Sequence, residues 1–252
     1  MKVIVLGSCG AWPTEGAACS GFLVEHDGFR VLVDAGYATF PKLLAHAEPA
    51  AVDAVLITHG HPDHCADLNP LLRARYLAVA GPAPRLAVYA PRHALDAVLA
   101  LDRPGMLDDA YELHEIEPGA DKGFEVGPFA VQARLLPHWV PNLGFRLTAD
   151  AGALAYTGDA GPDPAVAELA ADTDLLIAEA THPEDADMSP DEAGYLTSAA
   201  QAARQAVAAG ARALLLTHLW PGTDEQRALR AAAASGYAGE LDVAREGAVV
   251  EL

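Results

Sequence analysis

THGHPDHCADL, residues 58–68, contains three histidines and one aspartate within six consecutive positions. Imidazole nitrogens and carboxylate oxygens are the ligands that Zn²⁺ and similar divalent ions prefer. His59 and His61 are two positions apart, as on one face of a strand end, whereas Asp63 and His64 are adjacent. The simplest arrangement is therefore one metal ion held by the first pair and a second ion held by the next pair.

The segment before this motif predicts the scaffold that carries it. AVDAVLIT, residues 51–58, is a continuous apolar and β-branched run, which is typical of a buried strand. The ligands follow at its carboxyl end, where loops on a rigid scaffold carry chemistry. The competing interpretation is a polar loop with fortuitous histidines, and the density of ligand side chains disfavours it.

HGHPDH resembles the H-x-H-x-D-H signature of the metallo-β-lactamase superfamily, and the resemblance spans nearly the whole chain. Further segments resemble family elements in the correct order: VLGSCG (5–10), FRVLVDAGY (29–37), PHWVPNLGFR (137–146), AYTGDAGP (155–162) and LLLTHLWP (214–221). The YTGD and LTHL forms, and the histidine before GFR, look most like the ribonuclease Z and small phosphodiesterase branch.

The resemblance implies an α/β fold, a four-layer αββα sandwich, and the length fits a single hydrolase domain over residues 1–252. Apolar runs predict strands at 2–6, 21–25, 30–34, 52–57, 86–90, 111–116, 129–136, 143–148, 153–157, 174–178, 212–217 and 248–251. Helices are expected at 40–47, 65–79, 91–101, 163–171, 198–209 and 223–235. Ser198 and Gln201 form a capping-box pattern, and Gly210 is placed to end that helix.

The resemblance also implies a dinuclear metal site, most simply with two Zn²⁺ ions and with Mn²⁺ or Fe²⁺ as alternatives. The implied ligands are His59, His61 and His138 for the first ion, Asp63, His64 and His218 for the second, and Asp159 as a bridge. Taken singly, His138 or His218 would be an ordinary histidine; the ordered set favours ligands. Asp34 is expected either to orient a ligand or to be a turn residue before Gly36.

Three residues are candidates for catalysis: Asp63, Tyr195 and His182. In the ribonuclease Z branch a histidine precedes Ser/Thr ahead of the penultimate helix and assists the leaving group. This chain has GYLTSAAQAA there, so Tyr195 occupies the matching position. A phenol can donate a proton, although its reference pKa is about 10. The alternatives are that Tyr195 only packs, or that His182 in EATHPED supplies the proton.

All three tryptophans lie near the motif segments: Trp12 in the first glycine loop, Trp139 after His138, and Trp220 two residues after His218. If the ligands converge, these side chains are expected to rim one pocket where a nucleobase or another flat group stacks. The alternative is that each tryptophan only fixes its own loop to the core.

The charge balance bears on the partner. The net charge is −19, with 35 acidic and 16 basic residues and no basic cluster, which disfavours nucleic-acid binding. Ribonuclease Z also carries a long insertion that binds transfer RNA, whereas residues 81–137 here are short. We therefore expect a small-molecule substrate and no large nucleic acid. A homodimer is expected from the resemblance alone.

No apolar run reaches the length of a membrane span, and the amino terminus does not read as a signal peptide, so no membrane partner is expected. Three widely spaced cysteines do not suggest a disulfide framework, and a cytoplasmic location is the expectation. Cys65 follows His64 directly and is either a thiolate ligand or, as the favoured interpretation, a buried neutral thiol.

The expected function is hydrolysis of a small phosphodiester, such as a cyclic nucleotide, by a dinuclear metal-dependent enzyme. One alternative is hydrolysis of a carboxylic ester, lactone, thioester or β-lactam. The sequence after Asp159 is Ala-Gly-Pro162, which lacks the GD-x-LF pattern of glyoxalase II and the tyrosine of acyl-homoserine lactonases. Asp159 also stands where metallo-β-lactamases usually have a cysteine. A second alternative is a metal-binding protein without catalysis.

Overall fold

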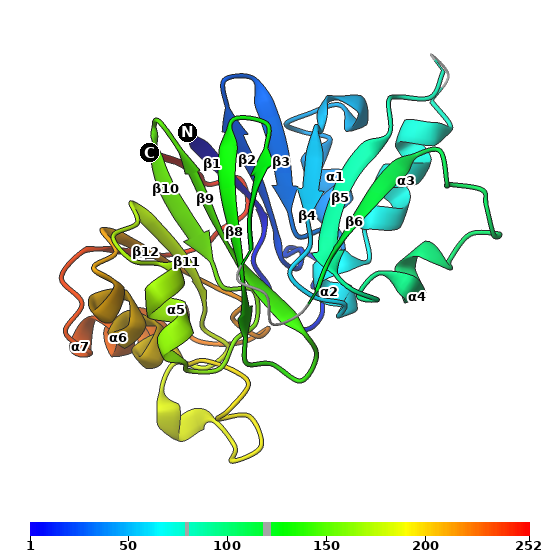
Figure 1. Ribbon diagram of the computed structural model, residues 1–252. Helices are drawn as coiled ribbons and strands as arrows, with labels where there is room; N and C mark the ends of the chain where they lie inside the picture. The colour runs from blue at the N-terminus through cyan, green and yellow to red at the C-terminus, as the bar shows by residue number, and fades with distance from the viewer. Residues whose placement is uncertain (79–80, 118–121) are drawn as a thin grey trace.

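The structure, a computed structural model, describes residues 1–78, 81–117 and 122–252, and two seven-stranded sheets lie at its centre (Figure 1). The first sheet has the order β14 (Val249–Glu251), β1 (Lys2–Gly7), β2 (Gly21–His26), β3 (Phe29–Val33), β4 (Ala54–Leu56), β5 (Leu86–Pro91) and β6 (Tyr111–Ile116). The second has the order β13 (Glu240–Val243), β12 (Ala213–Thr217), β11 (Leu175–Glu179), β10 (Gly152–Tyr156), β9 (Asn142–Ala149), β8 (Phe129–Leu136) and β7 (Lys122–Val126).

The two sheets are built alike. In the first sheet the pairs from β14 to β3 are antiparallel and the pairs from β3 to β6 are parallel. In the second sheet the pairs from β7 to β10 are antiparallel and the pairs from β10 to β13 are parallel. Each half of the chain therefore presents the carboxyl ends of parallel strands, where polar loop residues gather.

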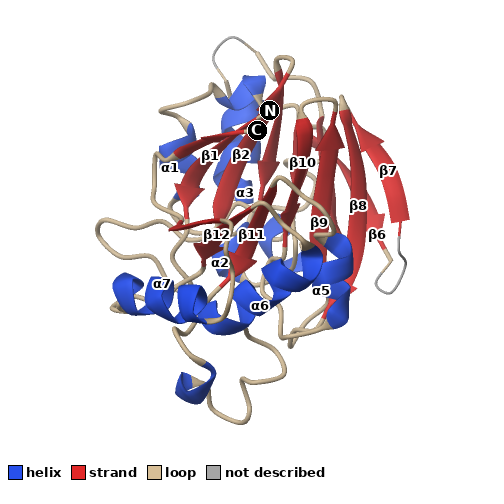
Figure 2. Ribbon diagram, turned by 90° about the vertical axis from the view of Figure 1, so that its left-hand side faces the viewer, coloured by secondary structure: helices blue, strands red, loops and turns tan. Residues whose placement is uncertain are grey.

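Helices cover the outer face of each sheet (Figure 2). The first sheet carries α1 (Thr39–Leu43), α3 (Leu68–Tyr76) and α4 (Asp96–Leu99), and the second carries α5 (Pro164–Leu169), α6 (Ala199–Ala209) and α7 (Glu225–Ala234). Alternation along β1 shows the layering, because Val3 and Val5 join the core between the sheets whereas Ile4 and Leu6 face the helices. The expected four-layer αββα sandwich is confirmed. No helix of the described residues is long and apolar enough to cross a membrane.

Two strands were not expected, β7 and β13. Both form edges of the second sheet, and their sequences, KGFEV and ELDV, mix charged residues with apolar ones. Edge strands carry charged side chains because one side of the strand faces solvent. A search for apolar runs therefore finds the inner strands and misses these edges.

Two expected helices are wrong in their bounds. Instead of one helix over 65–79 the chain forms α2 (Pro62–Cys65) and α3, and residue 79 lies outside the described residues. Pro70 has no N–H to donate and is tolerated only in the first turn of a helix, so α3 begins at Leu68. Over 91–101 only α4 forms, because His93 has a positive φ of 65° and interrupts the helix.

The capping box is confirmed. Ser198 accepts a hydrogen bond from the Gln201 backbone, the Gln201 side chain accepts one from Ser198, and Gly210 is left-handed with φ 67°. The cap fixes the residue at which α6 begins. It therefore also fixes the end of the preceding loop, which carries Tyr195.

Candidate metal centre

The candidate ligands lie where strands of both sheets end. His59 and His61 follow β4, Asp63 and His64 lie in α2, His138 follows β8, Asp159 follows β10 and His218 follows β12. His218 is left-handed, with φ 63°, a conformation that costs a non-glycine residue about 1–3 kcal/mol. Its backbone N–H donates to the Ser8 carbonyl over 2.8 Å, which holds the residue in place.

The loop before Asp159 requires a glycine. Gly158 has φ 58°, and a Cβ added there would lie 2.4 Å from Asn142 Oδ1 and 2.8 Å from Thr58 Cβ. Only a residue without a side chain fits between β9 and the His59 loop. Gly158 therefore brings Asp159 to the centre of the site.

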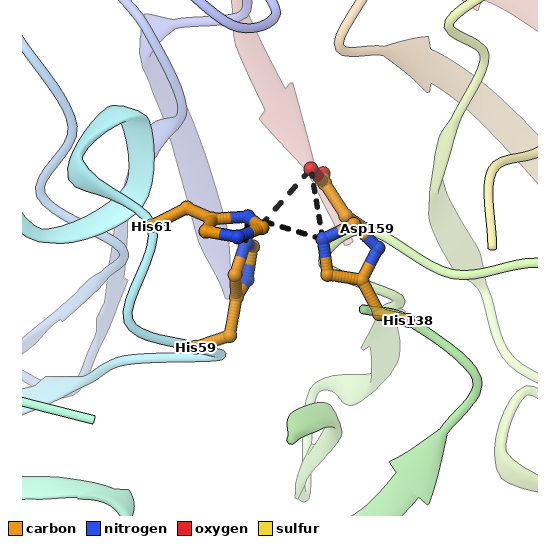
Figure 3. A group of neighbouring side chains, drawn as sticks. All are labelled: His59, His61, His138 and Asp159. Carbon is orange, nitrogen blue, oxygen red and sulfur yellow. Dashed lines mark hydrogen bonds and ion pairs between the residues drawn. The ribbon is translucent and has the colours of Figure 1, made fainter. Parts of the chain in front are cut away.

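The first group of candidate ligands consists of His59, His61, His138 and Asp159 (Figure 3). Each offers one atom, and these atoms lie within 4.8 Å of one another. His61 Nδ1 is 3.1 Å from both His59 Nε2 and His138 Nε2. Asp159 Oδ2 lies 3.9 Å from His59 Nε2 and 4.0 Å from His138 Nε2.

The second group consists of Asp63, His64, Asp159 and His218, all of them buried, and its ligand atoms also lie within 4.8 Å of one another. His218 Nε2 lies 3.2 Å from Asp63 Oδ2 and 3.2 Å from Asp159 Oδ2. His64 Nε2 and Asp159 Oδ1 are 3.1 Å apart, buried, and without a hydrogen-bonding partner. Buried polar atoms in this state fit the binding of a cation. Asp159 belongs to both groups, as expected for a bridging residue.

Four of the five histidines are held so that Nε2 faces the site. Nδ1 of His138 contacts the Tyr195 carbonyl over 3.0 Å and Nδ1 of His64 contacts Asp34 over 2.7 Å, and both partners can only accept. We therefore assign the proton to Nδ1 and the lone pair to Nε2. Nδ1 of His59 and of His218 each meet a threonine hydroxyl, at 3.0 and 3.2 Å, that donates to a carboxylate. This tautomer is the one in which Nε2 can bind a metal ion.

The charges of the first ligand group agree with this assignment, whereas in the second group burial is outweighed by the Asp159 carboxylate, which raises the pKa of His64 and of His218. Burial lowers the pKa of His59 well below its usual range, and it also lowers the pKa of His61 and of His138, so these imidazoles are neutral. Burial alone would raise the pKa of Asp159, but His218 and His64 outweigh it and hold that pKa well below its usual range. The result is three neutral imidazoles beside an ionised carboxylate, which is a donor set that suits a divalent cation.

Asp34 contacts the candidate ligand His64 from the first half of the chain. It follows β3 with φ 57° and is fully buried. Its carboxylate accepts hydrogen bonds from Thr58 N at 2.8 Å, Thr58 Oγ1 at 2.9 Å and Tyr156 OH at 2.9 Å, besides the contact with His64. The alternative of a simple turn residue does not account for these four contacts.

Glu179 has the corresponding place in the second half, and sequence reasoning missed it. It ends β11, is 1% exposed, and accepts hydrogen bonds from Ala160 N and Thr181 Oγ1, both over 2.6 Å. Burial, with the nearby Asp159 charge, raises the pKa of Glu179 to about 8. Thr181 in turn lies 3.2 Å from His218 Nδ1. The available signal was a glutamate ending the otherwise apolar strand LLIAE.

Cys65 is a buried thiol that belongs to neither ligand group. Its Sγ–H donates to the His61 carbonyl over 3.3 Å. Burial raises the pKa of Cys65 to about 12, which keeps the thiol neutral. The neutral-thiol interpretation accounts for both observations. The three cysteines of the chain, all within the described residues, are free.

The tryptophans lie beside the site, but in two places. Trp12 and Trp220 have ring centroids 6.1 Å apart. Trp139 instead lies 5.1 Å from the His138 ring and 5.5 Å from the Tyr195 ring. That the three tryptophans rim a single pocket stays a prediction.

The two candidate proton donors have different surroundings. Tyr195 is 42% exposed, and its carbonyl accepts the hydrogen bond from His138, so its loop adjoins the first ligand group. His182 Nε2 lies 3.6 Å from Glu192 Oε1, and its ring is 5.4 Å from Trp220. Among the described residues no hydrogen bond or ion pair links His182 to a candidate ligand, whereas the Tyr195 carbonyl contacts His138, so the geometry favours Tyr195.

The comparisons with known proteins agree with the fold and the site. The sequence matches the family described as the Beta-lactamase superfamily domain over residues 29–219. It is 31% identical over 255 residues to the probable metallo-hydrolase YhfI of Bacillus subtilis (strain 168), covering 100% of both chains. It is 32% identical over 295 residues to the Ribonuclease Z of Kineococcus radiotolerans, covering 96% of this chain and 91% of that protein. The crystal structure of B. subtilis YhfI has a TM-score of 0.87 at 28% identity, covering 100% of this chain and 98% of that one.

Proposed function

We propose that this chain, which belongs to the β-lactamase superfamily and has the fold of its metal-dependent hydrolases, cleaves a small phosphodiester such as a cyclic nucleotide. The observation that carries the proposal is the pair of adjoining ligand groups that share Asp159. The similarity to a Ribonuclease Z, a protein named for cleaving a polynucleotide, supports phosphodiester chemistry over ester or lactam chemistry. We also propose one domain over residues 1–252, because the central core takes side chains from both sheets.

The residues present fit two divalent ions, most simply zinc, with Mn²⁺ or Fe²⁺ as alternatives. His59, His61 and His138 would hold one ion, Asp63, His64 and His218 the other, and Asp159 both. Ions bound there would activate a water nucleophile and stabilise negative charge on phosphoryl oxygens. Ala11 N donates a hydrogen bond to Asp63 Oδ2 over 2.9 Å, which holds this carboxylate in place. That Asp63 also takes part in catalysis, besides binding a metal ion, stays a prediction.

Tyr195 is the proposed donor of a proton to the leaving oxygen. Its loop is tied to His138, and its ring is exposed beside Trp139. Replacing Tyr195 by Phe keeps the ring, so turnover of an unactivated substrate should fall roughly 10²–10⁴-fold while metal content stays intact. An activated nitrophenyl ester should lose less, because its leaving group departs without a proton. Small, equal effects of Tyr195→Phe and His182→Ala would exclude a donor from either side chain.

A small substrate fits this chain better than transfer RNA. The net charge of −19 opposes a long polyanion, whose binding depends on neutralising phosphates with Lys and Arg. Within residues 81–117 and 122–137 the chain forms β5, α4, β6, β7 and β8, so much of this segment belongs to the sheets. Precursor transfer RNA should therefore be a poor substrate, and efficient removal of a 3′ trailer at ordinary salt would overturn this part of the proposal.

A hydrolysis screen of the zinc- and manganese-loaded protein tests the proposal. Bis(p-nitrophenyl) phosphate and cyclic nucleotides should be cleaved, whereas a lactone, a carboxylic ester, a thioester and a β-lactam should not. Cleavage of only the carbonyl substrates would favour the alternative hydrolase. No turnover of any substrate by protein that holds its metal would favour a binding protein without catalysis.

A further inference from the structure

Four aromatic side chains beside the ligand groups form two separate pairs. The Trp12 pair consists of Trp12 and Trp220, and the Trp139 pair consists of Trp139 and Tyr195. Over residues 1–78, 81–117 and 122–252 no ring contact joins one pair to the other. Trp12 and Trp139 are each 50% exposed. Large aromatic side chains so far out of the core offer surface to a ligand.

The Trp139 pair is fixed to the His138 end of the metal centre. Trp139 follows His138 directly, and their ring centroids are 5.1 Å apart. The Tyr195 carbonyl accepts the hydrogen bond from His138 Nδ1 over 3.0 Å. Both rings of this pair are therefore placed by the residue that we assign to the first ion.

The Trp12 pair is fixed to the other end. Ala11 N, directly before Trp12, donates to Asp63 Oδ2 over 2.9 Å. A Cβ added to Gly10 would lie 2.8 Å from both His218 Nδ1 and Trp220 Cδ1, so these two side chains pass the same glycine closely. This pair therefore adjoins the second ligand group.

Backbone hydrogen bonds fix the loops that carry the Trp12 pair. Trp12 N donates to the Gly10 carbonyl over 2.8 Å, and Thr223 N donates to the Trp220 carbonyl over 3.0 Å. The Cys9 thiol donates to the Trp12 carbonyl over 3.5 Å. Because the loops are ordered before a ligand arrives, little freedom is lost when a flat group stacks on the rings.

The cavity beside the Trp139 pair has a mostly apolar lining. This cavity of about 430 Å³ is lined by Leu135, Pro137, Val140 and Pro141, among others. Its lining contains one acidic residue, Asp163, and no lysine or arginine. In a chain with net charge −19, stacking on aromatic rings is the available source of affinity for the organic groups of an anionic substrate.

We infer that the site takes a phosphodiester that joins two flat aromatic groups, such as a linear dinucleotide, with one group on the Trp139 pair and the other on the Trp12 pair. The inference rests on the proposed phosphodiesterase function and extends its substrate beyond a cyclic mononucleotide, which has one base. Hydrolysis adds one water: a bond forms from the water oxygen to phosphorus, the bond to one ester oxygen breaks, and that oxygen takes a proton. The products are a phosphomonoester and an alcohol.

A pair of synthetic substrates with the same leaving group tests the number of aromatic faces. Bis(p-nitrophenyl) phosphate has two rings and methyl p-nitrophenyl phosphate has one. The metal-loaded protein should show a KM roughly tenfold lower for the substrate with two rings, in keeping with one additional stacking contact. Trp12→Ala and Trp139→Ala should each reduce this difference between the two KM values to about threefold or less. Trp12→Phe and Trp139→Phe keep a ring and should retain most of it, and Leu101→Ala, at a 67% exposed side chain, is the control.

Binding gives a second readout that needs no turnover. The chain has three tryptophans, and all of them belong to the two pairs, so their fluorescence reports only on this site. Titration of the metal-free protein with the linear dinucleotide ApA should quench emission from both pairs, so that quenching persists in each single Trp→Ala variant. 3′,5′-Cyclic AMP has one base, so it should quench the fluorescence of one pair only. This quenching should be lost in the Trp→Ala variant of that pair and kept in the variant of the other pair.

The outcomes separate the inference from the proposed function. Equal KM values for the two nitrophenyl substrates, or an effect of only one pair on the two-ring substrate, would overturn the inference while phosphodiester hydrolysis stands. Failure to hydrolyse either substrate, with a lactone or β-lactam cleaved instead, would remove the proposed function and the inference with it.

Discussion

Asp34 and Glu179 are buried carboxylates beside the candidate metal centre, one from each half of the chain, and they contact the candidate ligands differently. Asp34 contacts a ligand directly, through His64 Nδ1 at 2.7 Å, and accepts three further hydrogen bonds. Glu179 accepts two hydrogen bonds and reaches His218 only through the Thr181 hydroxyl. The same arrangement of carboxylate, threonine and histidine thus occurs in both halves, but only Asp34 also contacts a histidine directly, at His64.

This difference indicates which of the two carboxylates is held more rigidly. A carboxylate with four contacts from three residues, Thr58, His64 and Tyr156, cannot move without breaking several hydrogen bonds. Each unsatisfied buried partner costs about 1–3 kcal/mol. A carboxylate with two donors and a hydroxyl between it and the ligand can adjust more easily. We therefore expect substitution of the carboxylate itself to cost more at Asp34 than at Glu179. Loss of a single hydroxyl contact should instead cost more beside Glu179, where fewer other contacts remain.

The largest effect should come from the residue that joins the two halves, Asp159. Replacing it by Ala removes a ligand from both groups, so the protein should lose at least one of two bound ions. Because bound ions supply several kcal/mol of transition-state stabilisation, hydrolysis should fall by about 10³-fold or more. Metal analysis of the purified variant, beside the control Asp150→Ala at an exposed carboxylate, checks this. A variant that still binds two ions would show that Asp159 is no bridge.

The next largest effect should follow from Asp34→Asn. The amide replaces one acceptor by a donor, which then faces the hydroxyl of Thr58 or Tyr156, or the His64 ring. The metal-free protein should lose about 1–3 kcal/mol of unfolding free energy, and metal affinity should fall roughly 10–100-fold. Denaturant unfolding and competition with a chelator measure the two effects. Unchanged affinity would remove the proposed role of Asp34 in orienting His64.

Much of the fold was predictable, because buried strands are continuous apolar runs. β4, β10 and β12 are examples, each buried along most of its length. The edge strands β7 and β13 were not predictable in this way, since half of their surroundings is solvent. The bounds of α3 and α4 depended on Pro70 and on the backbone of His93, which periodicity does not report.

The site was predictable where residues close in sequence share a motif, and less so where it depends on register. The motif at 58–68 and the later segments named the seven residues that the structure brings into two groups. Glu179 was missed because its role arises from the pairing of β11 with β12, which aligns Glu179 with Thr217 and places Thr181 beside His218. Sequence spacing contains no trace of that alignment.

A smaller, pH-dependent effect should distinguish Glu179 from Asp34. Burial and the Asp159 charge raise the pKa of Glu179 from 4.5 to about 8, so the folded protein binds this proton more tightly than the unfolded chain does. The stability that it contributes is fully present below pH 4.5 and is lost as the pH rises through about 8. Gln resembles the protonated acid, so Glu179→Gln should match the metal-free wild type near pH 5 and become the more stable protein near pH 9.

Urea unfolding of the metal-free proteins across this range measures the difference between Glu179→Gln and wild type. The difference isolates Glu179, because the other titrating groups are common to both proteins. A difference that is constant with pH would mean that Glu179 is already ionised in the folded metal-free protein.

The smallest effect, and the sharpest test of the contrast between the halves, is a matched pair of threonine substitutions. Thr58→Val and Thr181→Val each keep the shape of the side chain and remove the hydroxyl between a carboxylate and a histidine. Thr181→Val should cost about 1 kcal/mol, because it leaves His218 Nδ1 without its hydroxyl partner and one oxygen of Glu179 without its donor. Thr58→Val should cost less stability per hydrogen bond, since Asp34 keeps three other contacts, from Thr58 N, His64 and Tyr156. Metal affinity should fall only a few-fold in either variant, because each leaves one histidine, His59 or His218, without its hydroxyl partner on Nδ1. The loss should be greater for Thr181→Val, because Glu179 then keeps only the Ala160 N–H donor. If Thr58→Val proves the more harmful for metal binding, the hydroxyl contact to His59 matters more than the direct contact of Asp34 with His64, and the two halves are held by the same device after all.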